Sequence, residues 1–117
     1  MPKIFCLVSD LFFRTKIEET AHQLGKQVEF ISDSEKFFSL KEFPSLIIVD
    51  LNNSQIDSLS FAKKLKANPS TSSIKLIGYL SHVQTELQKS ALAVGFDQVL
   101  PRSLFSQKLG EILKFDN

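Results

Sequence analysis

Short apolar runs alternate along the chain with longer stretches in which apolar residues recur at helical spacing. Three of the runs are rich in Ile, Leu and Val and are bounded by polar residues, a pattern typical of buried parallel strands. Two weaker runs bring the predicted strands to five. The predicted strands are 4–8, 28–31, 45–49, 74–80 and 98–100.

The segments between these runs are predicted to be helical. After the first strand, a stripe of apolar residues extends from Phe13 to Leu24 and stops before Gly25, which favours the end of a helix. Comparable stripes follow each of the other strands, the fourth ending at Gly95. Further helices are therefore predicted over 34–41, 57–67, 82–94 and 103–115.

This alternation predicts an α/β fold. Strands joined through helices form a parallel sheet with helices on both faces, because right-handed crossovers place successive helices over it. We therefore predict a doubly wound, five-stranded parallel sheet. The polar stretch 67–73 is interpreted as a loop within one domain. In such sheets, ligands and chemistry gather at the carboxyl ends of the strands.

Composition narrows the class of protein. Hydrophobic residues make up 43% and charged residues 23% of the 117 residues, as in ordinary globular domains. The 14 Lys and Arg nearly balance the 13 Asp and Glu, so neither a nucleic-acid nor a membrane partner is expected. Cys6 is the one cysteine and lies in an apolar strand, where core packing is expected. No signal peptide or membrane span is evident, which favours a cytoplasmic protein.

Polar residues at the predicted strand ends are the candidates for a functional site. A carboxylate held at the end of a strand can act as a nucleophile or bind a cation, and a helix N-terminus next to it favours anions. The candidates are Ser9, Asp10, Asp50, Asn52, Ser81, His82, Arg102 and Ser103.

Two segments resemble the receiver domains of bacterial response regulators. Residues 44–52 are similar to the receiver strand that ends in the phosphoacceptor aspartate, which places Asp50 at that position, with Asp57 as the acidic residue before the next helix. Residues 93–102 are similar to the segment that ends in a catalytic lysine. The resemblance implies a flavodoxin-like sheet in strand order 2-1-3-4-5, and a single receiver-like domain over 1–117 without an output domain.

The sequence departs from the receiver pattern at the metal site. Receivers hold Mg²⁺ with two acidic residues after the first strand, and here these positions read Ser9-Asp10. Asp10 and Asp50 are therefore expected to bind Mg²⁺ weakly, and only if the chain is phosphorylated at all. No other cofactor is expected.

Three further positions differ from those of receivers. Leu80 falls where a phosphate-binding hydroxyl is usual, so Ser81 could act there only after a local shift. Arg102 replaces the lysine, keeps its charge and could pair with Asp50, with Ser103 after it. Val99 replaces the aromatic switch residue. The chain is therefore similar to atypical, or pseudo-receiver, members.

Three functions stay open. The first is a two-component signalling module that acts through protein contacts, with a histidine kinase or a downstream protein as partner, as a monomer or weak homodimer. The second is a working phosphoacceptor modified on Asp50. The third is a small-anion site made by Ser81, His82, Arg102 and Ser103, although the serines could simply cap helices. An enzyme is not expected, since no nucleophile–base pair or metal-ligand cluster is evident.

Overall fold

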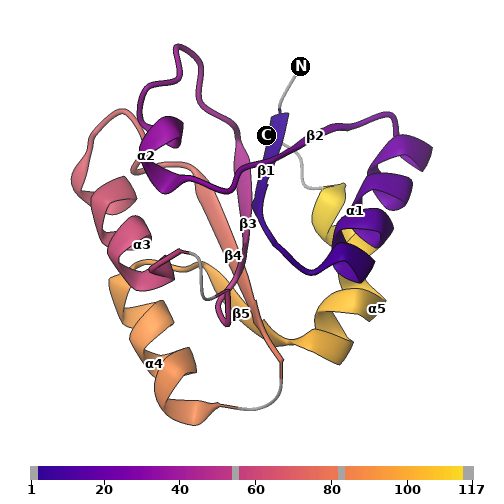
Figure 1. Ribbon diagram of the computed structural model, residues 1–117. Helices are drawn as coiled ribbons and strands as arrows, with labels where there is room; N and C mark the ends of the chain where they lie inside the picture. The colour runs from indigo at the N-terminus through magenta and orange to yellow at the C-terminus, as the bar shows by residue number, and fades with distance from the viewer. Residues whose placement is uncertain (1–2, 54–55, 82–83, 115–117) are drawn as a thin grey trace.

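The computed structural model describes residues 3–53, 56–81 and 84–114 and shows a parallel sheet between two layers of helices (Figure 1). The sheet has five strands in the order β2-β1-β3-β4-β5, and all four pairings are parallel. The predicted fold class and strand order are confirmed. The strands are β1 (Lys3–Leu7), β2 (Gln27–Phe30), β3 (Leu46–Asp50), β4 (Lys75–Leu80) and β5 (Gln98–Pro101).

The helices divide between the two faces of the sheet. They are α1 (Leu11–Gln23), α2 (Ser34–Phe37), α3 (Ser58–Ala67), α4 (Thr85–Val94) and α5 (Arg102–Leu113). Helices α1 and α5 cover one face, and α2, α3 and α4 cover the other (Figure 1). Side chains of a strand alternate between the faces, so Cys6 packs towards α1 and α5 while Leu7 packs towards the opposite layer. Cys6 is buried as expected, and burial raises the pKa of its thiol.

Carboxylates and glycines mark several helix ends. Asp10 caps α1 and Asp57 caps α3, each through backbone N–H groups of the first turn. Helix α4 ends at Gly95, as predicted, with φ at +119°. A Cβ at Gly95 would lie 2.5 Å from Cγ of Lys66, so both conformation and space require glycine there.

The second helix is shorter than the predicted 34–41 and ends at Phe37. The Phe37 ring is fully buried, and the next amides, including that of Leu40, bond to carbonyls three residues back. The Ser39 hydroxyl also donates to the Lys36 carbonyl, the acceptor that a continuing helix would use for Leu40. These local bonds replace the α-helical pattern.

Three other helices start within a few residues of the predicted position: α3 at Ser58 rather than 57, α4 at Thr85 rather than 82, and α5 at Arg102 rather than 103. Helix α5 ends at Leu113, and the predicted positions 82–83 and 115 lie outside the described residues. Within the described residues, no helix combines the length and apolar character needed to cross a membrane.

Candidate functional site

The ends of β1, β3 and β5 bring three of the predicted site residues to one edge of the sheet. Asp50 is the last residue of β3, Asp10 precedes α1, and Arg102 is the first residue of α5. Arg102 Nη2 lies 2.5 Å from Asp10 Oδ2, and the two side chains are 40% and 30% exposed. The ion pair therefore joins the start of α5 to the start of α1, and Arg102 pairs with Asp10 rather than with Asp50.

Both oxygens of Asp10 are engaged. Oδ1 accepts hydrogen bonds from the backbone N–H of Phe12, at 2.8 Å, and of Phe13, at 3.4 Å, while Oδ2 accepts from Arg102. The guanidinium of Arg102 also lies 4.5 Å from the centre of the Phe13 ring, a cation–π contact. Asp10 and Arg102 thus hold each other in place, and the charge of Asp10 is compensated within the protein.

This arrangement disfavours Mg²⁺ at Asp10. The ion requires several oxygen ligands in octahedral geometry, and both Asp10 oxygens already accept hydrogen bonds. Ser9 offers a neutral hydroxyl where receivers have a second carboxylate. Within the part of the chain that the structure describes, no three His, Cys, Asp or Glu side chains gather into a possible metal site. The positive charge next to Asp10 is the guanidinium of Arg102.

Asp50 is half-buried beside this ion pair. Its Oδ1 accepts a hydrogen bond of 2.9 Å from the backbone N–H of Asn52. Burial raises the pKa of the Asp50 carboxyl, and the charge of Asp10 raises it further, while the Asn52 N–H and the Arg102 charge lower it. The net effect is a raised pKa, so ionised Asp50 is disfavoured by the fold.

We expect Asp50→Asn to raise the melting temperature at neutral pH by about 1–3 °C, because Asn removes the half-buried charge and lost attraction to Arg102 offsets part of the gain. The size of this gain depends on pH. A raised folded-state pKa means that the neutral carboxyl stabilises fully below the ordinary value of 3.8, and that this stability is lost as pH rises through the folded-state value. Thermal unfolding from pH 7 down towards pH 4 should therefore show the variant's advantage shrinking.

Asp57→Asn is the matched control for this prediction. Hydrogen bonds from the Ser60 backbone and hydroxyl lower the pKa of the Asp57 carboxyl, so its stabilisation is present above 3.8 and lost as pH falls. Its pH dependence should have the opposite sign. If the Asp50→Asn protein is less stable than wild type at pH 7, the fold does not disfavour the ionised form of Asp50, and the explanation is wrong.

Asn52 connects the loops that follow β3 and β4. Its Oδ1 accepts a 2.7 Å hydrogen bond from the backbone N–H of Ser81, and its Nδ2 donates to Gln84 Oε1 at 3.0 Å. Leu80 is buried in the core layer under α3 and α4, and therefore presents no polar group at this edge. The Asn52 bridge was not predicted, since its partners lie on another loop.

The structure does not support helix caps at Ser81 and Ser103. The residue that caps α4 is Gln84, and the one that caps α5 is Pro101; neither makes a side-chain capping bond. Ser103 lies exposed in the first turn of α5, and Arg102 pairs with Asp10. His82, the fourth member of the predicted anion site, lies outside the described residues.

Tyr79 is a neighbour of the site that sequence analysis missed. It lies directly opposite Asp50 in the β3–β4 pairing, and its ring stacks on Phe105 at 4.6 Å and approaches Phe13 at 5.0 Å. Burial, and then the charge of Asp50, raise the pKa of its hydroxyl. Val99, at the predicted position of the switch residue, is buried in the opposite core layer. The aromatic residue opposite Asp50 therefore lies on β4, whereas receivers carry their switch residue on β5.

Comparison with known proteins supports the fold over almost the whole chain. Neither protein-family models nor curated proteins match the sequence. Among solved structures, the chemotaxis response regulator CheY4 of Vibrio cholerae matches with a TM-score of 0.81 at 19% identity, over 97% of both chains. The chain has the receiver fold.

Two further structures agree with this fold. A response regulator from Thermotoga maritima has a TM-score of 0.79 at 15% identity, over 97% of this chain and 95% of that one. The phosphorylated cyanobacterial phytochrome response regulator RcpA has a TM-score of 0.80 at 17% identity, over 97% and 89%. At such identities the likeness establishes the receiver fold, and function must be argued from the site.

Proposed function

We propose that this chain is a receiver-like signalling module of two-component type, which acts through contacts with other proteins and whose phosphorylation chemistry has degenerated. The observation that carries the proposal is the Arg102–Asp10 ion pair. In this arrangement a fixed guanidinium supplies the positive charge beside Asp10 and Asp50, the place where receivers hold a metal ion. A partner, either a histidine kinase or a downstream signalling protein, would recognise one stable conformation.

The differences from receivers at positions 9, 80 and 102 affect successive parts of phosphoryl transfer to Asp50. Phosphoryl transfer to a carboxylate depends on a metal ion to neutralise developing charge and on donors to the phosphoryl oxygens. Ser9 removes one metal ligand, Arg102 engages the remaining Asp10 oxygen, and Leu80 lies in the core instead of offering a hydroxyl. Losses of groups that act together reduce activity severely. A working phosphoacceptor at Asp50 is therefore the second candidate.

Exposed apolar side chains support a role in protein contacts. Leu11 and Phe12 begin α1 and are 74% and 66% exposed, whereas the adjacent Phe13 is buried. Large apolar side chains exposed together are a common feature of protein-binding surfaces. Phe12 and Phe13 thus lie on different faces of α1, and Phe12 is available for contact with a partner.

Intact-mass measurement after incubation with acetyl phosphate and Mg²⁺ tests the proposal. We expect no mass increase of one phosphoryl group on the wild-type chain, because Ser9 supplies no carboxylate for a metal, Arg102 engages Asp10, and Leu80 offers no hydroxyl donor. A receiver known to accept phosphate should be treated in parallel to show that the donor is active. An adduct on the wild-type chain that is absent from Asp50→Ala would replace the proposal by the phosphoacceptor.

A further inference from the structure

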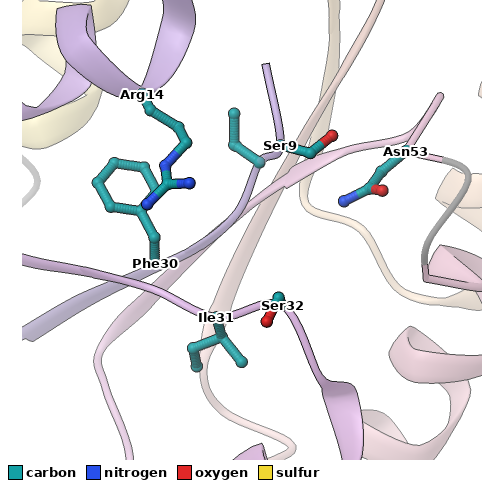
Figure 2. Close-up of a pocket in the computed structure, with 7 residues that line it drawn as sticks. Ser9, Arg14, Phe30, Ile31, Ser32 and Asn53 are labelled. Carbon is teal, nitrogen blue, oxygen red and sulfur yellow. The ribbon is translucent and has the colours of Figure 1, made fainter. Parts of the chain in front are cut away.

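A polar hollow lies at the same edge of the sheet, and Asp50 is not among the residues that line it. It has a volume of about 240 Å³ and is formed where β1, β2 and β3 end (Figure 2). Strand β1 is where the strand order reverses, and ligands of doubly wound sheets bind beside such a reversal. The lining residues are Val8, Ser9, Arg14, Phe30, Ile31, Ser32 and Asn53.

Arg14 gives this hollow a positive charge without a paired acid. Its guanidinium lies 4.8 Å from the centre of the Phe30 ring, which holds it over the hollow. Within the described part of the chain, Arg14 makes no ion pair. None of the residues that line the hollow is acidic, and the three acidic residues next to them in sequence are engaged elsewhere. Glu29 pairs with Lys3. Asp10 pairs with Arg102, and Asp33 caps α2 by accepting from Glu35 N–H.

Hydroxyl and amide groups from three other segments surround the same space. Figure 2 shows Arg14 and Asn53 reaching into the hollow from opposite sides, with Ser9 and Ser32 between them. Both serines are exposed, and neither hydroxyl bonds to another described residue. The Asn53 amide is oriented by a 3.4 Å bond to the Leu7 carbonyl. Polar groups thus converge from α1 and from the loops that follow β1, β2 and β3.

We propose that this hollow binds a small phosphate-type anion, either free or as the phosphate group of a small ester. An arginine fork with hydroxyl donors on other sides suits an oxyanion with several oxygens in different directions. The volume is below the roughly 300–1,000 Å³ of pockets for drug-sized ligands, which favours a single small group. This inference does not depend on the proposed function, because none of these contacts requires phosphorylation of Asp50.

Titration of the full, isotope-labelled chain with inorganic phosphate at constant ionic strength tests this inference through amide NMR shifts. We expect saturable shifts at Ser9, Ser32 and Asn53. Arg14→Gln should weaken binding by about 10- to 100-fold, as expected for loss of a charged hydrogen-bond donor. Ser32→Ala should weaken it by a smaller factor. The small ester glycerol 3-phosphate forms a second arm, and binding tighter than that of phosphate would identify an ester as the ligand.

Lys89→Gln is the matched control, because Lys89 is exposed on α4 and outside the hollow, and its replacement removes one positive charge as Arg14→Gln does. Its affinity for phosphate should equal that of wild type. Equal weakening by both variants, shifts of the same size with acetate, or no saturable shift at these amides would overturn the inference. Retained native spectra of the variants show that any loss of binding is local.

Discussion

Asp10→Ala is expected to destabilise the protein by about 2 kcal/mol, the sum of about 1 kcal/mol for a lost helix cap and about 1 kcal/mol for a lost, partly exposed ion pair. The two contributions come from different oxygens of one side chain. Oδ1 accepts the first amides of α1, and Oδ2 accepts from Arg102. Urea unfolding at pH 7 measures the change.

Asp10→Asn separates the cap from the ion pair. Asparagine caps a helix about as well as aspartate, so this variant should lose only the contribution of the pair, about 1 kcal/mol. Arg102→Gln should cost a similar amount, and the double variant should cost little more than either single one. A loss below about 0.5 kcal/mol for Asp10→Ala would contradict the roles assigned to this residue.

The fold was predictable because the strand signals are strong and continuous. Runs such as 45–49 are apolar throughout, and a strand buried on both faces needs that composition. The structure places β3 over Leu46–Asp50, within one residue of the prediction. The overestimate of α2 has a local cause, since Ser39 and Leu40 form turn-type bonds that spacing does not report.

The sequence predicted where the candidate site lies, but it did not predict that Arg102 pairs with Asp10 rather than with Asp50. The carboxyl ends of parallel strands meet at one edge, so Asp10, Asp50 and Arg102 were expected together. Which acid Arg102 pairs with depends on how the loops after β1 and β5 direct the side chains. One signal was available, because Asp10 before the apolar stripe of α1 is a usual helix cap.

The Arg14 hollow had no signal in the sequence. Arg14 and Ser32 belong to no motif, and they lie together only because β1 and β2 pair side by side. Tyr79 likewise resembles any other residue of an apolar strand until the register places it opposite Asp50. Both features depend on contacts between segments distant in sequence.

We propose that Arg102 replaces a metal ion as the cation at the edge of the sheet that carries Asp10 and Asp50. Restoring the receiver pattern should reverse this, because Ser9→Asp adds a carboxylate ligand, and a lysine at 102 lacks the planar fork that binds Asp10. We expect the Ser9→Asp/Arg102→Lys variant to bind Mg²⁺ at least about tenfold more tightly than wild type, a difference of about 1.4 kcal/mol.

Mg²⁺ titration of the wild-type chain, followed through the amide signals of Asp10, Asp50 and Asn52, tests this claim most directly. With Arg102 on Asp10, these signals should show no saturable change up to roughly 20 mM Mg²⁺, well above the millimolar range of weak carboxylate sites. The double variant should show saturable shifts at the same amides. Saturable Mg²⁺ binding by wild type in the millimolar range, with shifts centred on Asp10 and Asp50, would contradict the account.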